Sequence, residues 1–186
     1  MSDKRALRRE FRKGRHDYVA SLAPGARDAL EHALVGVVAS TLANARIIAS
    51  YAAAGDEIDP SGIKALAGSL AFPRVSGPTL SFHLAAPGDL LPGFKGIAEP
   101  ARSVPKVMPD LLLVPLLAVT PTGVRLGQGG GYYDRALADL RRHSQVIAIG
   151  LAFDVQIADV LPAEPWDMPL DWVATPTRLF DCAKVR

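Results

Sequence analysis

Short, continuously apolar runs separated by helix-like segments constrain the fold of this chain more than any other feature of its sequence. These runs are RIIASYA, DLLLVPLLAV, QVIAIGLAF and DWVATP. Strands of this kind are buried on both faces, as in a parallel sheet that is covered by helices. The segment before the first run places Leu30, Leu34 and Val38 at helical spacing. The sequence therefore predicts a single three-layer α/β domain with a mainly parallel (mixed) sheet flanked by helices, similar to Rossmann folds.

Three further elements are predicted between the first two runs. Pro60 is expected to start a helix that continues through Leu70, followed by a short strand at LAFPRV. The segment 79–85 alternates apolar and polar residues, with Leu80, Phe82 and Leu84 on the apolar side. Such alternation is typical of a strand with one buried face.

The composition indicates one domain of a cytoplasmic protein. A chain of 186 residues can bury one substantial core, so we expect residues 1–186 to form a single domain. The only cysteine, Cys182, excludes an internal disulfide and fits a reducing compartment. The charged first segment lacks the apolar stretch of a secretory signal, and no apolar run approaches the roughly 20 residues of a membrane span. We expect a monomer with no membrane partner.

Four glycines, at positions 127, 129, 130 and 131, gather shortly after the second apolar run. Because glycine loses the most conformational freedom on folding, such a cluster indicates backbone that a ligand approaches closely. A strand, a glycine loop and a helix in this order direct backbone N–H groups at an anion. Neither familiar phosphate motif fits. Tyr132 or Asp134 occupies the last glycine position of G-x-G-x-x-G, and no lysine lies between Lys106 and Lys184 for a Walker A loop.

The charges beside this loop predict a Mg²⁺–nucleotide site. Arg125 is a permanent planar cation directly before the glycines. Asp134 lies where the next helix begins, and its carboxylate would repel phosphates unless a divalent cation lay between them. Mg²⁺ takes one or two carboxylates together with phosphate oxygens. The alternatives are a structural ion pair for Arg125 and a helix-terminal charge for Asp134.

Basic residues crowd the start of the chain. Lys4 and Arg8 are four residues apart and share one face of a predicted helix, from which we expect both to project into solvent. This face either is simply solvated or meets an anion such as phosphate or nucleic acid. A nucleic-acid-binding module is the weaker alternative, because no aromatic residues are interleaved with these charges and the acidic Glu57, Asp134 and Asp167 would have no role.

The stretch PTGVRLGQGGGYYDRAL resembles the signature of the 5-formyltetrahydrofolate cyclo-ligase family, also called 5,10-methenyltetrahydrofolate synthetases. The resemblance extends over nearly the whole chain through KRALR, GDEID, FPRV, GIAEP, LLLVP and PWDMPLDWVATP, in that order. It implies ATP- and Mg²⁺-dependent cyclisation of 5-formyltetrahydrofolate to 5,10-methenyltetrahydrofolate, with release of ADP and phosphate. Transfer of the γ-phosphoryl group to the formyl oxygen would give an N5-iminium phosphate, which N10 attacks. Such chemistry depends mainly on positioning and charge neutralisation.

The resemblance also implies which residues form the site. Nucleotide-binding residues would be Lys4, Arg5, Ala6, Leu7, Arg8, Arg125, Leu126, Gly127, Gln128, Gly129, Gly130, Gly131, Tyr132 and Tyr133. Folate-binding residues would be Ala52, Glu57, Gln128, Gly129, Gly130, Gly131 and Tyr132. Arg125, Tyr132 and Glu57 would act in catalysis, although Tyr133 fits a core position equally well. Asp134 and Asp167 would bind the metal, with Asp171 as the alternative to Asp167.

Three positions depart from the family pattern. Gln128 and Gly130 stand where some relatives carry basic residues, so this loop would hold phosphates with less charge and more bare backbone. Ala52 stands where others place a larger apolar residue against the substrate. A relative that only binds folate, or that acts on another substrate, therefore remains an alternative.

Overall fold

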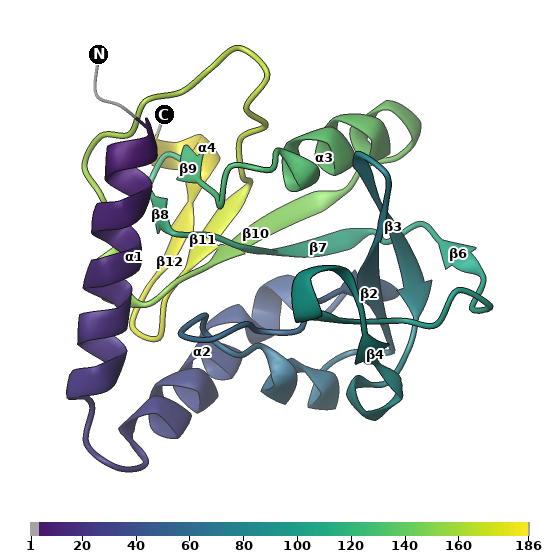
Figure 1. Ribbon diagram of the computed structural model, residues 1–186, viewed down its shortest axis with the longest axis horizontal. Coiled ribbons are helices and arrows are strands. Elements are labelled where there is room, and N and C mark those ends of the chain that lie inside the picture. Colours follow the sequence, from purple (N-terminus) through teal and green to yellow (C-terminus); the bar gives the residue numbers. More distant parts are fainter. Residues whose placement is uncertain (1–3, 186) are drawn as a thin grey trace.

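The main sheet of the protein has eight strands, which a computed structural model describes within residues 4–185 (Figure 1). In spatial order they are β12 (Leu179–Asp181), β11 (Trp172–Ala174), β10 (Ile147–Leu151), β7 (Leu111–Pro115), β1 (Ile47–Ala49), β2 (Ser69–Ser76), β3 (Thr79–Leu84) and β6 (Lys106–Val107). The strands from β11 to β2 are parallel, and β12, β3 and β6 run antiparallel to their neighbours. The predicted mixed α/β fold is confirmed.

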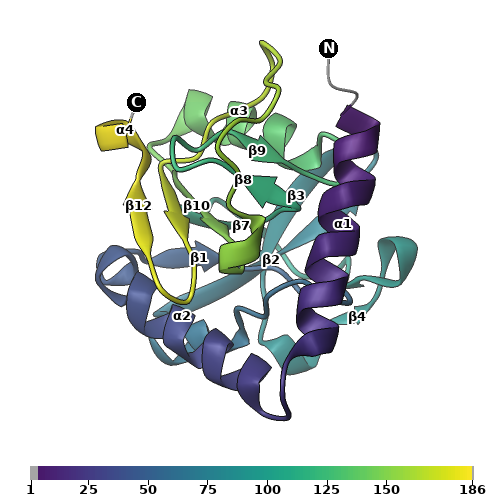
Figure 2. The ribbon, with the colours of Figure 1, turned by 90° about the vertical axis from the view of Figure 1, so that its left-hand side faces the viewer.

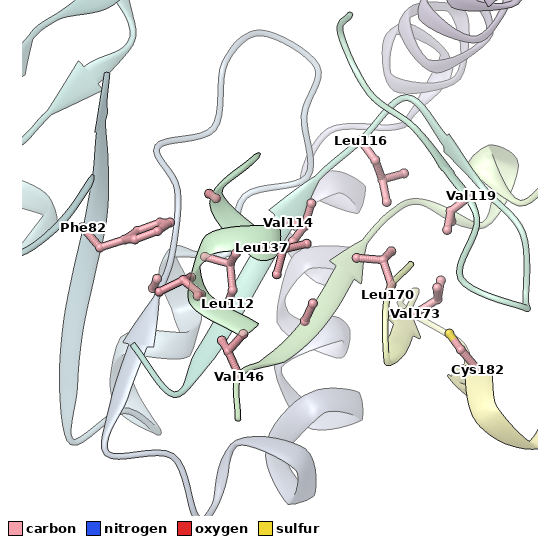
Figure 3. Packing of buried hydrophobic residues seen from close by; sticks show 14 of the residues in the cluster. Phe82, Leu112, Val114, Leu116, Val119, Leu137, Val146, Leu170, Val173 and Cys182 are labelled. Atoms are coloured by element: carbon pink, nitrogen blue, oxygen red, sulfur yellow. The ribbon is translucent and has the colours of Figure 1, made fainter. Parts of the chain in front are cut away.

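Helices cover both faces of this sheet, because consecutive residues of the central strand β7 point to opposite sides. Leu111 and Leu113 pack in one buried cluster with α2 (Ala26–Leu42). Leu112 and Val114 pack in a second cluster with α3 (Tyr132–His143), as Figure 3 shows. The continuous apolar run that predicted a doubly covered strand therefore supplies both cores.

The first helix, α1 (Lys4–Ser21), lies against a small second sheet at the side of the molecule (Figure 2). That sheet pairs β8 (Ala118–Val119) with β9 (Arg125–Leu126). Leu7 and Phe11 pack on the buried cluster beneath the helix. One turn further on, the buried Arg15 donates a hydrogen bond to the Leu116 carbonyl over 3.2 Å. One face of α1 is therefore part of the core.

Short elements complete the chain. They are the 3₁₀ turns η1 (Ser61–Ala65), η2 (Pro87–Asp89), η3 (Phe94–Gly96) and η4 (Asp154–Gln156), the paired strands β4 (Leu91–Pro92) and β5 (Ala98–Glu99), and the terminal helix α4 (Cys182–Val185). No helix within residues 4–185 is long and apolar enough to span a membrane.

Three details of the sequence prediction were wrong. The helix expected from Pro60 through Leu70 is only the 3₁₀ turn η1, because Leu70 belongs to β2 and pairs with Ile48 of β1. The run DLLLVPLLAV forms two strands, since β7 ends at Pro115, which has no N–H to extend the ladder.

The third correction concerns β3, where the alternation holds only in part. Phe82 is buried as predicted, but Leu84 is exposed and His83 is buried. His83 tolerates burial because its ring nitrogens contact the Ser81 hydroxyl at 2.9 Å and the Val104 carbonyl at 2.6 Å. Consecutive residues point to opposite faces, so β3 buries Phe82 on one face and a satisfied polar side chain on the other.

Candidate active site

A cavity of about 810 Å³ lies where β1 and β7 end, and the glycine loop opens onto it. Ligands of open α/β sheets commonly bind beyond the carboxyl ends of the strands. The predicted site residues that line the cavity are Lys4, Arg8, Ala52, Glu57, Arg125, Leu126, Gly127, Gln128, Gly129, Gly130, Gly131, Tyr132, Tyr133, Asp134 and Asp167. Arg5, Ala6, Leu7 and Asp171 are not among the lining residues. Segments from both ends of the described chain therefore meet in one cavity.

The buried guanidinium of Arg125 joins three of the segments around this cavity. It lies on β9 and donates to Asp134 Oδ1 at the start of α3 over 2.5 Å, and to the carbonyl of Met168. The Met168 N–H returns a hydrogen bond to the same Asp134 oxygen over 3.0 Å. Burial lowers the pKa of Arg125, and the Asp134 carboxylate opposes that effect. Both alternatives considered for these residues, an ion pair and a helix-terminal charge, are present in the structure.

The glycine loop presents unpaired backbone donors. Within residues 4–185, no hydrogen bond uses the N–H groups of positions 128 to 131. Gly129 and Gly131 have φ values of 99° and 65°, in the left-handed region that L side chains rarely adopt. Gly131 is also the N-cap of α3, whose first-turn amides have no intrahelical partner. The loop and helix end together offer a row of N–H groups to an anion.

Arginine side chains occupy the carbonyl oxygens of the same loop. Arg8 Nε donates to the Gly127 carbonyl over 3.0 Å, and Arg135 Nη2 donates to the Gly130 carbonyl over 2.7 Å. Arg12 adds a 2.7 Å hydrogen bond to the Gln128 side chain. The expectation that Arg8 projects into solvent is wrong, because the helix packs its face against the loop. Helix α1 thus contacts the loop directly.

Two carboxylates of the cavity can complete a cation site. Lys4 donates to Asp167 Oδ2 over 2.7 Å, and the Glu164 N–H donates to the same oxygen. Only 20% of the Lys4 side chain is exposed, so it too does not project freely into solvent as expected. Within residues 4–185, no hydrogen bond uses Asp134 Oδ2 or Asp167 Oδ1.

These donors fit Mg²⁺ that takes the rest of its ligands from phosphates and water. The described residues contain no group of three or more acidic, histidine or cysteine side chains that could hold a metal without such help. Asp171 is committed elsewhere, since its Oδ2 accepts hydrogen bonds from Arg141 and from the Ala148 N–H. Of the two aspartates considered, only Asp167 faces the cavity.

Glu57 also lines the cavity, in the turn that follows β1. Its Oε2 accepts a 3.1 Å hydrogen bond from the Ala54 N–H, and Arg27 binds its carbonyl over 2.7 Å. Burial raises the pKa of Tyr51 and of Tyr133, and the negative charge of Glu57 raises both further. Both tyrosines line the cavity, and the raised pKa values keep both hydroxyls protonated at neutral pH.

Several lining residues were not found from the sequence. Tyr51 is one, held by a 2.7 Å hydrogen bond from its hydroxyl to the Ile58 carbonyl. Phe94 and Ile97 form an exposed apolar rim on the β4–β5 loop, and Phe94 contacts the Tyr132 ring edge-on at 6.0 Å between centroids. Trp166 is another. Only the proline-rich, irregular composition of 87–109 hinted that this segment serves a cavity rather than the core.

Similarity to known proteins identifies the family of this chain. The sequence model of the 5-formyltetrahydrofolate cyclo-ligase family matches residues 1–176. The chain belongs to this family.

Two curated relatives bear the name 5-formyltetrahydrofolate cyclo-ligase. The Escherichia coli K12 protein is 42% identical over 89 residues, which cover 46% of this chain and 48% of that protein. The Mycolicibacterium smegmatis protein is 40% identical over 98 residues, covering 50% and 48%. The matched segments therefore span about half the length of these family members.

Two solved structures share the fold. The NMR structure of Aquifex aeolicus 5,10-methenyltetrahydrofolate synthetase has a TM-score of 0.76 at 27% identity and covers 95% of this chain and 93% of its own. A 5,10-methenyltetrahydrofolate synthetase from Mycoplasma pneumoniae has a TM-score of 0.72 at 24% identity, covering 94% and 99%. The family fold thus extends over nearly the whole chain.

The buried ion pair makes a prediction about stability. Asp134→Asn should lower the free energy of unfolding by about 1.5–3 kcal/mol, because Arg125 would keep a neutral acceptor but lose its counter-charge. Asp167→Asn is the matched control, since its partner Lys4 begins a helix and can turn to solvent, and about 1 kcal/mol or less is expected. Urea unfolding of both variants provides the measurement. Equal losses would contradict the special role of Asp134.

Proposed function

We propose that the protein is a 5-formyltetrahydrofolate cyclo-ligase that uses ATP and Mg²⁺ to form 5,10-methenyltetrahydrofolate, ADP and phosphate. The observation that carries this proposal is a single cavity lined by two chemically different sets of groups. One set comprises Lys4, Arg8, the free loop amides and two carboxylates, which we take as the nucleotide end, and the other comprises Glu57 and aromatic side chains, which we take as the folate end. A nucleotide and a folate can therefore bind side by side.

The nucleotide end suits a triphosphate. Lys4 and Arg8 supply positive charge from α1, and the N–H groups of positions 128 to 131 supply donors from the loop. A bound Mg²⁺, held by Asp134 and Asp167, would neutralise charge on the β- and γ-phosphates. We propose Arg125 as the anchor of this end rather than a direct phosphate ligand, because its guanidinium already binds Asp134 and Met168.

The folate end suits a flat, hydrogen-bonding ring. The Glu57 carboxylate can accept hydrogen bonds from amino or ring N–H groups, and Tyr132 and Phe94 offer aromatic surface beside it. Ala52 lines the same cavity with a small side chain, which leaves room next to the ring. This end recognises shape and polarity, and it carries no group that must form a covalent bond.

The proposed chemistry needs positioning above all. Formamide oxygen is a poor leaving group and must be activated before it can depart. Transfer of the γ-phosphoryl group to that oxygen activates it and gives an N5-iminium phosphate and ADP. The N10 nitrogen of the same molecule then attacks the formyl carbon and loses its proton as phosphate departs. Holding the reacting atoms in one cavity converts these steps into effectively intramolecular ones. We further propose that the protein acts as a cytoplasmic monomer.

The decisive test is the stoichiometry of the reaction. Purified protein with 5-formyltetrahydrofolate, ATP and Mg²⁺ should release ADP and the methenyl product in equal amounts. Nucleotide analysis measures the ADP, and absorbance measures the methenyl product. Without folate, ADP release should be slow, because no phosphoryl acceptor is present. Cyclisation at a comparable rate without ATP would exclude the proposed mechanism.

The role of α1 can be tested by removing its cationic groups. Lys4→Ala and Arg8→Ala should each raise the KM for ATP roughly tenfold to a hundredfold, the usual cost of losing a charge-assisted contact. Arg9→Ala is the matched control, because Arg9 is exposed on the same helix and does not line the cavity. An unchanged KM in both variants would return this helix face to a structural role.

Glu57→Gln tests the folate end. The amide keeps the volume and one acceptor oxygen but turns donors toward the folate N–H groups, so affinity for 5-formyltetrahydrofolate should fall roughly tenfold or more while ATP affinity stays unchanged. The control is Asp56→Asn, since Asp56 pairs with His16 and does not line the cavity. Direct titration with each ligand measures both constants. Wild-type folate affinity, or an equal loss for ATP, would remove Glu57 from the folate end.

A further inference from the structure

Trp166 is a large aromatic side chain at the mouth of the cavity, and most of its surface is exposed. It lines the cavity, yet 69% of its surface is exposed. An indole left in water forgoes the stabilisation that burial would give, and exposed tryptophans are typical of recognition sites. The other tryptophan, Trp172, lies in β11 and packs against the buried cluster beneath α2.

The backbone holds Trp166 in a defined place. It occupies the third position of a tight turn that is closed by the Asp167 N–H, which donates to the Glu164 carbonyl over 2.9 Å. The Asp167 carboxylate closes the turn from the other side by accepting the Glu164 N–H over 2.8 Å. Lys4 of α1 binds the same carboxylate over 2.7 Å. The indole is therefore presented from a pinned turn rather than from a loose loop.

This turn belongs to the nucleotide end of the cavity. Its neighbours are Lys4 and Asp167, which supply a cation and a metal-binding oxygen, and Figure 2 shows the segment between η4 and β11 rising beside the first turn of α1. The aromatic side chain Phe94 contacts Tyr132, and among the described residues neither ring makes a ring contact with Trp166.

We propose that Trp166 is the stacking platform for the base of the bound nucleotide. This inference rests on the proposed function, because it takes the triphosphate to lie on the loop amides and the base to extend from it toward the mouth. Base–indole stacking tolerates every base, since each has a π-face, and larger rings stack over more area. The platform selects purines over pyrimidines and discriminates little between adenine and guanine, because an indole face makes no hydrogen bond to a base edge.

The first experiment uses fluorescence of Trp166 itself. Trp166 and Trp172 are the only tryptophans in the chain, so Trp172→Phe leaves Trp166 as the sole reporter. Titration with Mg·ATP should change its emission, whereas tripolyphosphate, which has no base, should bind without that change. A response to 5-formyltetrahydrofolate instead of ATP would place Trp166 at the folate end and overturn the proposal.

The second experiment measures binding by calorimetry in the otherwise wild-type chain. Trp166→Ala should lower the affinity for ATP about 5- to 150-fold, which corresponds to ~1–3 kcal/mol per stacked base, and leave the affinity for tripolyphosphate unchanged. Trp166→Phe should restore part of the loss. Val160→Ala is the matched control, because Val160 is 84% exposed on the same segment and does not line the cavity.

The outcomes separate this inference from the proposed function. Undiminished ATP affinity in Trp166→Ala, with cyclisation intact, overturns the platform alone. An equal loss of ATP and tripolyphosphate affinity also overturns it, because the turn would then act through Lys4 and Asp167. If the wild-type protein binds neither ligand, the nucleotide end itself is wrong and both proposals fall.

Discussion

The arrangement of the site depends on one buried cation. Arg125 is almost inaccessible to water, and a guanidinium cannot shed its charge, so its N–H groups must find partners inside the protein. They find them on the N-terminal turn of α3 and on the segment that follows η4. Removing one partner would leave an uncompensated charge in a low-dielectric environment. This requirement draws three distant segments together around the cavity.

Arginine side chains also shape the glycine loop, but through its carbonyl groups. Arg8 and Arg135 donate hydrogen bonds to the Gly127 and Gly130 carbonyl oxygens, which water would otherwise do. The N–H groups of positions 128 to 131 stay unpaired within residues 4–185, and they still need hydrogen-bond acceptors. This division offers a physical reason why Gln128 and Gly130 need not be basic. The cations bind the loop carbonyls, and the backbone N–H groups are left available to an anion.

Periodicity predicted the layers well, because alternate residues of a buried strand must pack on opposite helices. Leu111 to Val114 illustrate this, because alternate members of the run pack in the clusters of α2 and α3. Local spacing failed where tertiary pairing decided the structure. Leu70 follows a helical pattern but pairs with β1, and His83 is buried because Val104 supplies an acceptor from a distant turn. The strand β12, only three residues long and paired at the sheet edge, carried too little pattern to be predicted.

The candidate site was predictable where its residues cluster in sequence, as they do from Arg125 to Asp134. Contacts between residues far apart in the sequence were not predictable. The pairing of Lys4 with Asp167 joins residues 163 positions apart, and no local pattern in the sequence signals it. Non-local contacts of this kind slow folding, because chain entropy is lost before they form. A nucleotide that binds the native cavity and not the unfolded chain would, at a hundred times its Kd, add about 2.7 kcal/mol to the stability of the native state. Occupancy of the cavity would then govern how long the chain persists in a cell as well as what it converts.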